Sequence, residues 1–180
     1  MTYHRMHGKF ANTYETASTR KFRYGRTETI RPLTANLMNF INAFNTGAAK
    51  ELYQKFVSSH LTQVKECSEG AGFDRHFLGL QVMMKDNESH PMFQDKTLAF
   101  IKTFVLSTSN MSPAESYLAL GFGPGCLDGY GINYAISQDM AKLSVSARLS
   151  STESNPFLFR KTFHAVVQDM IDLLSNKSKL

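Results

Sequence analysis

The stretch GINYAISQDMAKLSVSARL, from Gly131 to Leu149, contains two segments with the character of β-strands. Residues 131–136 are mostly apolar, and residues 142–149 alternate polar and apolar side chains. Alternation with a period of two is typical of a strand that buries one face. The stretch therefore predicts two strands of a sheet in the C-terminal half of the chain.

A helix is expected soon after these strands. Asn155 can cap its first turn, and Pro156 fits the first helical position. A single apolar face follows at helical spacing, made by Phe159, Phe163, Val166, Val167, Met170, Ile171 and Leu174. A helix with such a face packs against a core, so we expect it to cover the sheet.

The remaining elements are expected toward the N-terminus. The spacing of apolar side chains predicts three helices, over residues 34–45, 48–68 and 74–85. Two further strands are predicted over residues 103–106 and 117–122, and a polar loop or an exposed turn over residues 86–95. Residues 1–31 show neither period and predict short irregular elements and loops. The order of elements predicts an α/β fold with a mixed sheet and flanking helices.

Length and composition restrict the class of protein. The chain has 180 residues, of which 42% are hydrophobic, enough for one domain with a core. Two cysteines, Cys67 and Cys126, cannot make a disulfide framework or a four-cysteine zinc site. No apolar run approaches the ~20 residues of a membrane helix. Residues 1–5 are polar and lead into no apolar segment, so no signal peptide is expected.

Positive charge is concentrated at the start of the chain. The formal net charge is +5, and residues 1–31 hold seven Lys or Arg against two Glu, so the whole excess lies there. Such a field favours an anionic partner. Arg20, Arg23 and Arg26 alternate with Phe22 and Tyr24, a pattern that suits phosphate groups, single-stranded nucleic acid or an ordinary solvated face.

Common motifs do not decide the function. The glycines of residues 121–131 lack the spacing of a dinucleotide fingerprint and the Lys-Ser/Thr of a phosphate loop, so a turn between strands is favoured. None of the six histidines is spaced as a metal ligand, and no metal site is predicted. The hydroxyls of Ser107, Thr108 and Ser109 could stabilise an oxyanion or cap a turn.

Four blocks together resemble the C-terminal part of the carnitine/choline acyltransferase family. They are Thr13-Tyr14-Glu15-Thr16-Ala17-Ser18-Thr19-Arg20 running on to Arg26-Thr27-Glu28-Thr29-Ile30-Arg31-Pro32, then Phe73-Asp74-Arg75-His76, then Leu106-Ser107-Thr108-Ser109-Asn110, and Gly121-Phe122-Gly123-Pro124 with Asp128-Gly129-Tyr130-Gly131. Their order and spacing cover nearly the whole chain. Arg31-Pro32, the block around Arg75 and the final helix look most similar to the carnitine palmitoyltransferase 2 branch.

The resemblance implies transfer of a fatty acyl group between coenzyme A and carnitine. It implies that Tyr14, Thr27 and Arg75 hold the carnitine carboxylate, with the Ser107 hydroxyl nearby. A carboxylate bound by arginine and hydroxyls is a charge-assisted site. Ser109 matches the hydroxyl that faces the oxyanion of the tetrahedral intermediate, which makes it the catalytic residue expected in this chain.

Three further roles are implied by the same resemblance. Thr16 matches a hydroxyl at the junction of carnitine and coenzyme A, and Asn110 falls where the family contacts coenzyme A. Phe122 matches an aromatic ring that faces the trimethylammonium group, where cation–π attraction operates. Coenzyme A or acyl-CoA is then a co-substrate, and no permanently bound cofactor is expected.

The resemblance also implies what the chain lacks. The family's general-base histidine, in a His-Ser/Ala motif followed by Asp-Gly, has no match here. The chain is therefore expected to be part of a larger acyltransferase of the chloramphenicol-acetyltransferase type and inactive alone. The alternative is a truncated, non-catalytic fragment that binds a ligand or a partner chain. Expected partners are carnitine, acyl-CoA, the N-terminal half of such an enzyme and an inner-membrane surface, but no nucleic acid.

The domain and the location follow from the same reading. Residues 1–175 are expected to form the acyltransferase portion and residues 176–180 a tail. Ser178-Lys179-Leu180 has the form of a peroxisomal address, or else is the lysine-containing end of a solvated helix. The palmitoyltransferase branch favours the mitochondrion instead, so both organelles stay open.

Overall fold

A five-stranded mixed sheet organises the chain in the computed structural model, which describes residues 1–175. Its strands, in spatial order, are β2 (Thr27–Ile30), β1 (Thr13–Ser18), β3 (Leu106–Asn110), β4 (Tyr130–Ile136) and β5 (Ala141–Ser146). β3 is parallel to both of its neighbours, whereas β2 and β5 run antiparallel at the two edges. The expected α/β fold with a mixed sheet is confirmed.

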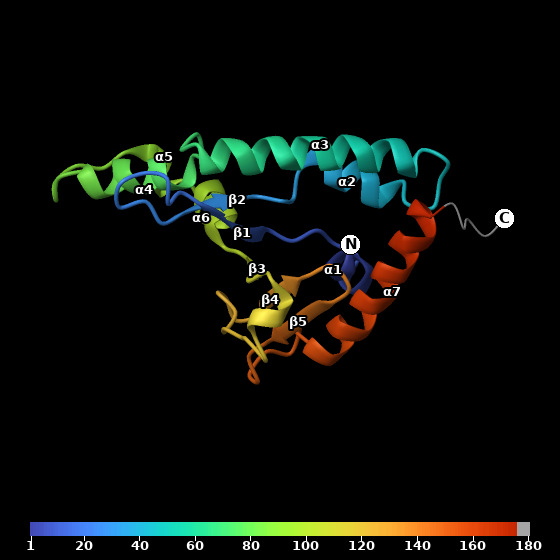
Figure 1. Cartoon of the computed structure of the whole chain (residues 1–180). Coiled ribbons are helices and arrows are strands. Elements are labelled where there is room, and N and C mark those ends of the chain that lie inside the picture. The colour runs from blue at the N-terminus through green and yellow to red at the C-terminus, as the bar shows by residue number, and fades with distance from the viewer. Residues whose placement is uncertain (176–180) are drawn as a thin grey trace.

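Helices surround this sheet (Figure 1). They are α1 (Thr2–His7), α2 (Ala35–Asn42), α3 (Ala49–Ser68), α4 (Asp74–Met83), α5 (Pro91–Gln94), α6 (Lys96–Lys102), the 3₁₀ helix η1 (Ala114–Ser116) and α7 (Pro156–Leu174). α3 runs across the top of the view above β1 and β2, and α7 lies on the right, beside β4 and β5. None of the helices within residues 1–175 is long and apolar enough to cross a membrane.

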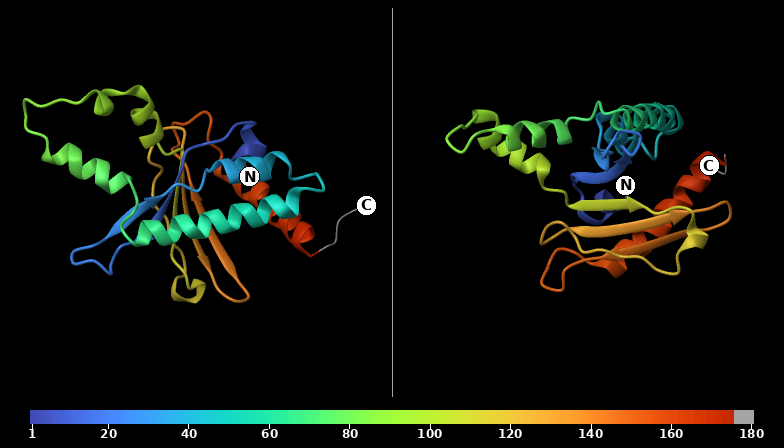
Figure 2. Two further views of the ribbon diagram at one scale, coloured as in Figure 1. Left: turned by 90° about the horizontal axis from the view of Figure 1, so that it is seen from above. Right: turned by 60° about the vertical axis from the view of Figure 1, so that its left-hand side comes forward.

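Two apolar clusters attach the helices to the sheet. Tyr130 and Ile132 of β4 pack with Tyr3 of α1 and Phe159 of α7. Ala17 and Ile30 pack with Cys67 of α3. The pairing register places both clusters on the same face of the sheet. The opposite face of β4 and β5 looks away from α7 (Figure 2), and this leaves room for a site.

The predicted helices are confirmed, and side-chain caps explain where α2 and α7 begin. The Thr34 side chain accepts a hydrogen bond from the Leu37 N–H at the start of α2. Asn155 accepts one from Leu158 at the start of α7, with Pro156 in the first turn as predicted. The strands predicted over 131–136 and 142–149 correspond to β4 and β5, although β5 ends at Ser146.

Several sequence predictions were wrong. Residues 1–31 contain α1, β1 and β2 rather than only irregular elements. Residues 86–95, in contrast, contain the predicted loop or exposed turn, with the single turn α5 starting at a proline. The strand predicted over 103–106 begins only at Leu106, because Asp95 caps α6 and the helix continues to Lys102.

The strand predicted over residues 117–122 is absent from the structure. Leu118 is 97% exposed, so this apolar run does not bury one of its faces in a sheet. The Lys142 Nζ donates to the Tyr117 carbonyl oxygen at 2.6 Å, which holds the segment beside β5 without strand pairing. An apolar run predicted a strand here, but side chains from the sheet fix it as an irregular wall.

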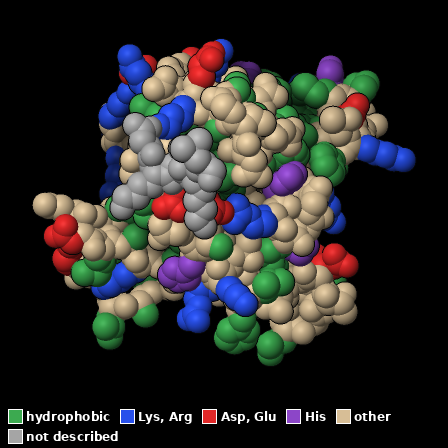
Figure 3. Space-filling view, turned by 90° about the vertical axis from the view of Figure 1, so that its right-hand side faces the viewer, with side chains coloured by type: hydrophobic (Ala, Val, Ile, Leu, Met, Phe, Trp, Pro, Cys, Tyr) green, Lys and Arg blue, Asp and Glu red, His purple; other side chains and the backbone are tan. Residues whose placement is uncertain are grey.

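Apolar side chains also remain at the surface of α7. Figure 3 shows hydrophobic side chains among Lys and Arg on this side of the molecule. Those of α7 that are exposed are Phe157, Leu158, Val167, Ile171 and Leu174. The Ser178-Lys179-Leu180 prediction lies outside the described residues.

Candidate active site

One face of β1 and β3 carries a row of hydroxyl groups. Side chains alternate along a strand, so Tyr14, Thr16 and Ser18 of β1 share a face. Tyr14 is paired with Ser107 of β3, and Ser107 and Ser109 therefore lie on that same face. This is the face opposite the two apolar clusters. The sequence-predicted hydroxyls are thus brought together by strand register.

β1 and β3 separate immediately after this pair. Their register contains only Thr13 with Leu106 and Tyr14 with Ser107. Beyond it β1 pairs only with β2, while β3 pairs with β4 along its whole length. The chain leaves the two parallel strands toward opposite edges of the sheet, and such a point at the carboxyl ends of strands is where open α/β sheets bind ligands. We call it the β1/β3 fork.

Two hollows open beside the fork. The first, of about 420 Å³, is lined by Tyr14, Arg75, Ser107 and five neighbours, Thr29, Asp74, Leu78, Lys102 and Phe104. The second, of about 500 Å³, is lined by Thr16, Ser18, Arg20, Gly25, Arg26, Thr27, Ser109, Asn110 and Met111. Seven of the eight sequence-predicted site residues therefore lie in two neighbouring hollows, with two more arginines in the second.

Arg75 connects the two hollows. It belongs to the first turn of α4, and its Nε donates to the Thr27 carbonyl oxygen at 2.9 Å. Thr27 itself lines the second hollow. The Arg75 side chain is exposed, so its remaining N–H groups can reach an anion. Arginine and threonine, 48 positions apart in the chain, thus belong to a single site.

A buried carboxylate fixes α4 against β2. The Glu28 side chain is buried and accepts hydrogen bonds from the Thr29 N–H at 2.6 Å and the Arg75 N–H at 3.2 Å. Gly72 lies so close to Glu28 that a Cβ at position 72 would overlap its side chain. The absence of a side chain at position 72 therefore lets Glu28 reach the start of α4 and place Arg75.

Arg31 supports the first hollow from behind. Its guanidinium donates to both carboxylate oxygens of Asp74, at 2.9 and 2.7 Å, and to the Ile101 carbonyl at 2.7 Å. It also lies over the rings of Phe73 and Phe104, at 5.1 and 4.9 Å from their centroids. Arg31 and Asp74 belong to the sequence blocks that resemble the family, but neither was assigned a role from the sequence. Their separation along the chain hides a bidentate pair that only the fold brings together.

Phe122 does not line either hollow. Its carbonyl oxygen accepts a hydrogen bond from the Ser146 hydroxyl of β5 and lies close over Gly131 of β4, the strand partner of Ser107. Phe122 is therefore beside the strand next to the one that carries Ser107 and Ser109, but outside the two hollows that the other seven predicted residues line. No group of three or more His, Cys, Asp or Glu among residues 1–175 is arranged to hold a metal ion.

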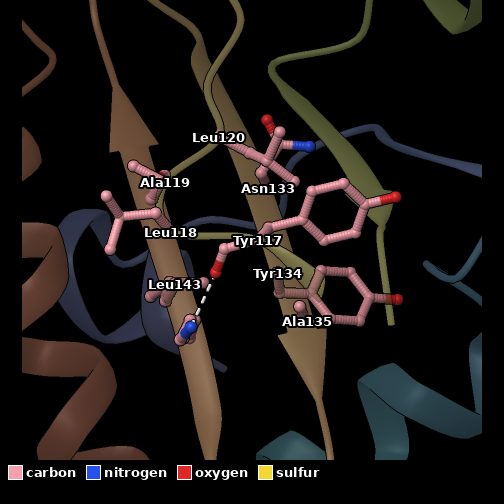
Figure 4. A pocket seen from close by; sticks show the side chains of 10 residues that line it. Tyr117, Leu118, Ala119, Leu120, Asn133, Tyr134, Ala135 and Leu143 are labelled. Carbon is pink, nitrogen blue, oxygen red and sulfur yellow. Dashed lines mark hydrogen bonds between the residues drawn. The ribbon is translucent and has the colours of Figure 1, made fainter. Parts of the chain in front are cut away.

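A third hollow lies along β4 and β5 (Figure 4). It has a volume of about 440 Å³, and the irregular wall over 117–120 forms one side of it. Tyr117 and Tyr134 extend their rings in the same direction, and Leu118, Leu120 and Leu143 add apolar surface. Asn133, the strand partner of Ser109, also lines it. Sequence reasoning missed this hollow because it treated 117–122 as a strand.

The chain is similar in sequence to known acyltransferases. The sequence profile of the family described as Choline/Carnitine O-acyltransferase matches residues 1–165. Carnitine O-acetyltransferase of Rattus norvegicus is 35% identical over 98% of this chain and 29% of its own length. Peroxisomal carnitine O-octanoyltransferase of Bos taurus is 36% identical over 97% and 30%. The muscle isoform of carnitine O-palmitoyltransferase 1 of Rattus norvegicus is 32% identical over 96% and 24%. The chain thus spans less than a third of these relatives.

Proposed function

Because the chain belongs to the choline/carnitine O-acyltransferase family, we propose that it forms the carnitine-binding part of a carnitine O-acyltransferase. Such an enzyme moves an acyl group between the thiol of coenzyme A and the hydroxyl of carnitine. The observation that carries the proposal is the β1/β3 fork, where residues from β1, β2, α4 and β3 line two neighbouring hollows.

The first hollow is the proposed site for the carnitine carboxylate. It combines the Arg75 guanidinium with the hydroxyls of Tyr14 and Ser107. Charge-assisted hydrogen bonds of this kind are roughly twice as strong as those between neutral groups. Bound in this way, carnitine is oriented with respect to the thioester, and such orientation lowers the entropic part of the barrier.

The second hollow is the proposed site of acyl transfer. The carnitine oxygen attacks the thioester carbonyl carbon, and the tetrahedral intermediate collapses with cleavage of the C–S bond. The Ser109 hydroxyl stabilises the oxyanion of this intermediate. Among the described residues this hydroxyl makes its hydrogen bond to the weak acceptor Met111 Sδ, at 3.8 Å, so little is lost when it turns to an oxyanion. Thr16 and Asn110 line the same hollow and are the proposed contacts to coenzyme A.

The proton must pass from the carnitine hydroxyl to a base and from there to the thiolate of coenzyme A. None of the histidines within residues 1–175 lines either hollow. We therefore assign the base to sequence outside the 180 residues. The hollow of Figure 4, lined in part by leucine and tyrosine side chains, offers room for an acyl chain, and the palmitoyl branch resemblance makes a long chain the first substrate to test.

The test combines this chain with a separately expressed N-terminal half of a carnitine acyltransferase that carries the His…Asp-Gly motif. We expect the chain alone to bind carnitine by calorimetry and the mixture to release coenzyme A from palmitoyl-CoA in the presence of carnitine. Arg75→Ala should abolish carnitine binding, whereas the exposed Arg148→Ala serves as the control. A mixture that associates but stays inactive, while carnitine still binds, would favour the non-catalytic binding fragment.

A further inference from the structure

A carboxylate occupies the β1/β3 fork on the face opposite the hydroxyl row. Glu15 is the first residue of β1 beyond the last pair with β3. Its side chain is only 8% exposed. Glu15 therefore lies where the backbone hydrogen bonds between β1 and β3 end. Beyond this point the two strands separate and form opposite walls of the second hollow.

Hydrogen bonds from Glu15 reach three strands. Its Oε2 accepts from the Thr108 hydroxyl of β3 at 2.7 Å and from the Tyr134 hydroxyl of β4 at 2.8 Å. Its Oε1 accepts from the Thr16 N–H at 2.8 Å and from the Thr16 hydroxyl at 3.2 Å. Thr108 also contacts the Tyr14 carbonyl oxygen at 2.7 Å. The Glu15 side chain thus connects β1 and β3 where backbone hydrogen bonds between these strands are absent.

Burying the carboxylate of Glu15 costs free energy, because its charge is removed from water. None of the ion pairs within residues 1–175 includes Glu15, and the groups that hydrogen-bond to it are N–H and hydroxyl donors. Burial and the negative charge of Glu15 raise the pKa of Tyr134, which keeps this hydroxyl a donor. An apolar side chain would fill a buried position without the cost of removing a charge from water. The hydrogen bonds, and not the burial, explain the residue.

The two threonines that bond to Glu15 are adjacent to the proposed site residues. Thr108 stands between Ser107 and Ser109, and side chains alternate along a strand. Holding Thr108 on one face therefore directs both serines to the other face. Thr16 lines the second hollow itself. Glu15 consequently acts on both walls of that hollow without lining it.

We propose that Glu15 is a positioning residue, whose carboxylate bridges the β1/β3 fork and fixes the separation between Thr16 on one wall and Ser109 on the other. This inference rests on the proposed function. A displacement of about 1 Å between reacting groups costs on the order of 100-fold in rate, so loss of the bridge should reduce turnover while leaving carnitine binding at the first hollow.

The test is Glu15→Gln, which keeps the size but replaces one accepting oxygen with a donor. We expect the folded variant to bind carnitine within about 3-fold of wild type, and the complemented mixture to lose about 10- to 100-fold in kcat. Amide resonances of residues 107–110 should shift in Glu15→Gln and not in Glu69→Gln, a control at an exposed position. Unchanged kcat and unchanged resonances in a folded Glu15→Gln protein would overturn the inference.

A second variant covers failure of Glu15→Gln to fold. Tyr134→Phe removes one donor and leaves the carboxylate with its other partners, and we expect a loss of about 3- to 10-fold in kcat at unchanged carnitine affinity. Equal losses in carnitine affinity and kcat, in step with a lower Tm, would show a general structural role instead. If wild type neither binds carnitine nor restores activity, the proposed function fails first; if wild type does both and Tyr134→Phe matches it, only the Glu15 inference fails.

Discussion

Ser109 carries the chemical part of the proposal. We expect Ser109→Ala to lower kcat of the complemented mixture by about 10²- to 10³-fold, since a single oxyanion donor contributes this much. Carnitine affinity should change little, because Ser109 lines the second hollow and not the first. The measurement is steady-state release of coenzyme A, with the exposed Ser58→Ala as control. A loss in carnitine binding equal to the loss in kcat would place Ser109 in ground-state binding instead.

The ion pair between Arg31 and Asp74 is expected to matter for stability. Both side chains are largely buried, at 17% and 10% exposed, and breaking a buried pair from one side costs about 3–5 kcal/mol. Arg31→Ala should therefore lower the free energy of unfolding by about 3 kcal/mol in urea denaturation.

The matched control for Arg31 is the ion pair of Lys55 with Glu51, which lies on the exposed side of α3. Lys55→Ala should leave the urea midpoint nearly unchanged, because water already solvates both partners. Equal effects of Arg31→Ala and Lys55→Ala would mean that Arg31 does not support the hollow. Arg31→Lys should also lower the free energy of unfolding, since lysine cannot make the bidentate pair with Asp74.

Among the elements, α2 depends on one aromatic side chain. Phe40 is 1% exposed and packs against Phe44, Tyr53 and Phe56. We expect Phe40→Ala to lower the free energy of unfolding by about 3–5 kcal/mol. Phe157→Ala on α7, at a position 81% exposed, should have almost no effect. Thermal and urea unfolding of the two variants would compare them directly, and a similar cost for both would contradict this packing.

The elements that sequence patterns predicted are those whose burial follows a simple period. α2, α3, α4 and α7 have apolar side chains at helical spacing, and β4 and β5 have mostly apolar or alternating ones. β1 was not predicted, because its buried positions include Glu15 and a pattern based on apolar residues treats glutamate as exposed. Its carboxylate is buried only because Thr108 and Tyr134, more than 90 positions away, donate to it. Local periodicity cannot contain that information.

For the molecule as a whole, stability should fall in mild acid. Burial lowers the pKa of both His7 and His60, and His7 Nε2 and His60 Nδ1 are buried without a hydrogen-bond partner. In the unfolded chain histidine titrates near ~6.5, so below this pH the unfolded state binds more protons. The stability that the two neutral histidines contribute is therefore fully present above pH ~6.5. It is lost as the pH falls toward the lowered pKa values.

This pH dependence can be measured as Tm at pH 7.5 and 5.5. We expect a lower Tm at pH 5.5, and a smaller difference in the double variant His7→Gln and His60→Gln. His76→Gln, at an exposed position of α4, should keep the full difference. An identical pH dependence in the double variant and in wild type would assign the effect to other groups.

The site as a whole could be predicted only through resemblance. Composition identified the basic segment. The residue types of Ser107 and Ser109 alone fitted either stabilisation of an oxyanion or capping of a turn. What brings Tyr14 beside Ser107 is parallel pairing between distant strands, which no local pattern encodes. Arg75 reaches Thr27 because Glu28 holds α4 in place. The resemblance named these residues, and the register explains why they meet.

The pairing of β1 with β3 also has a consequence for how the chain folds. Residues 19–105, with β2 and five helices, lie between these two neighbouring strands. Joining them closes a long loop, and the entropy of that closure must be overcome before the contact stabilises anything. Helices such as α3 form from local contacts and are fast. We expect the β1/β3 fork to appear late in folding, so a ribosome would have to release most of this chain before the proposed site could exist.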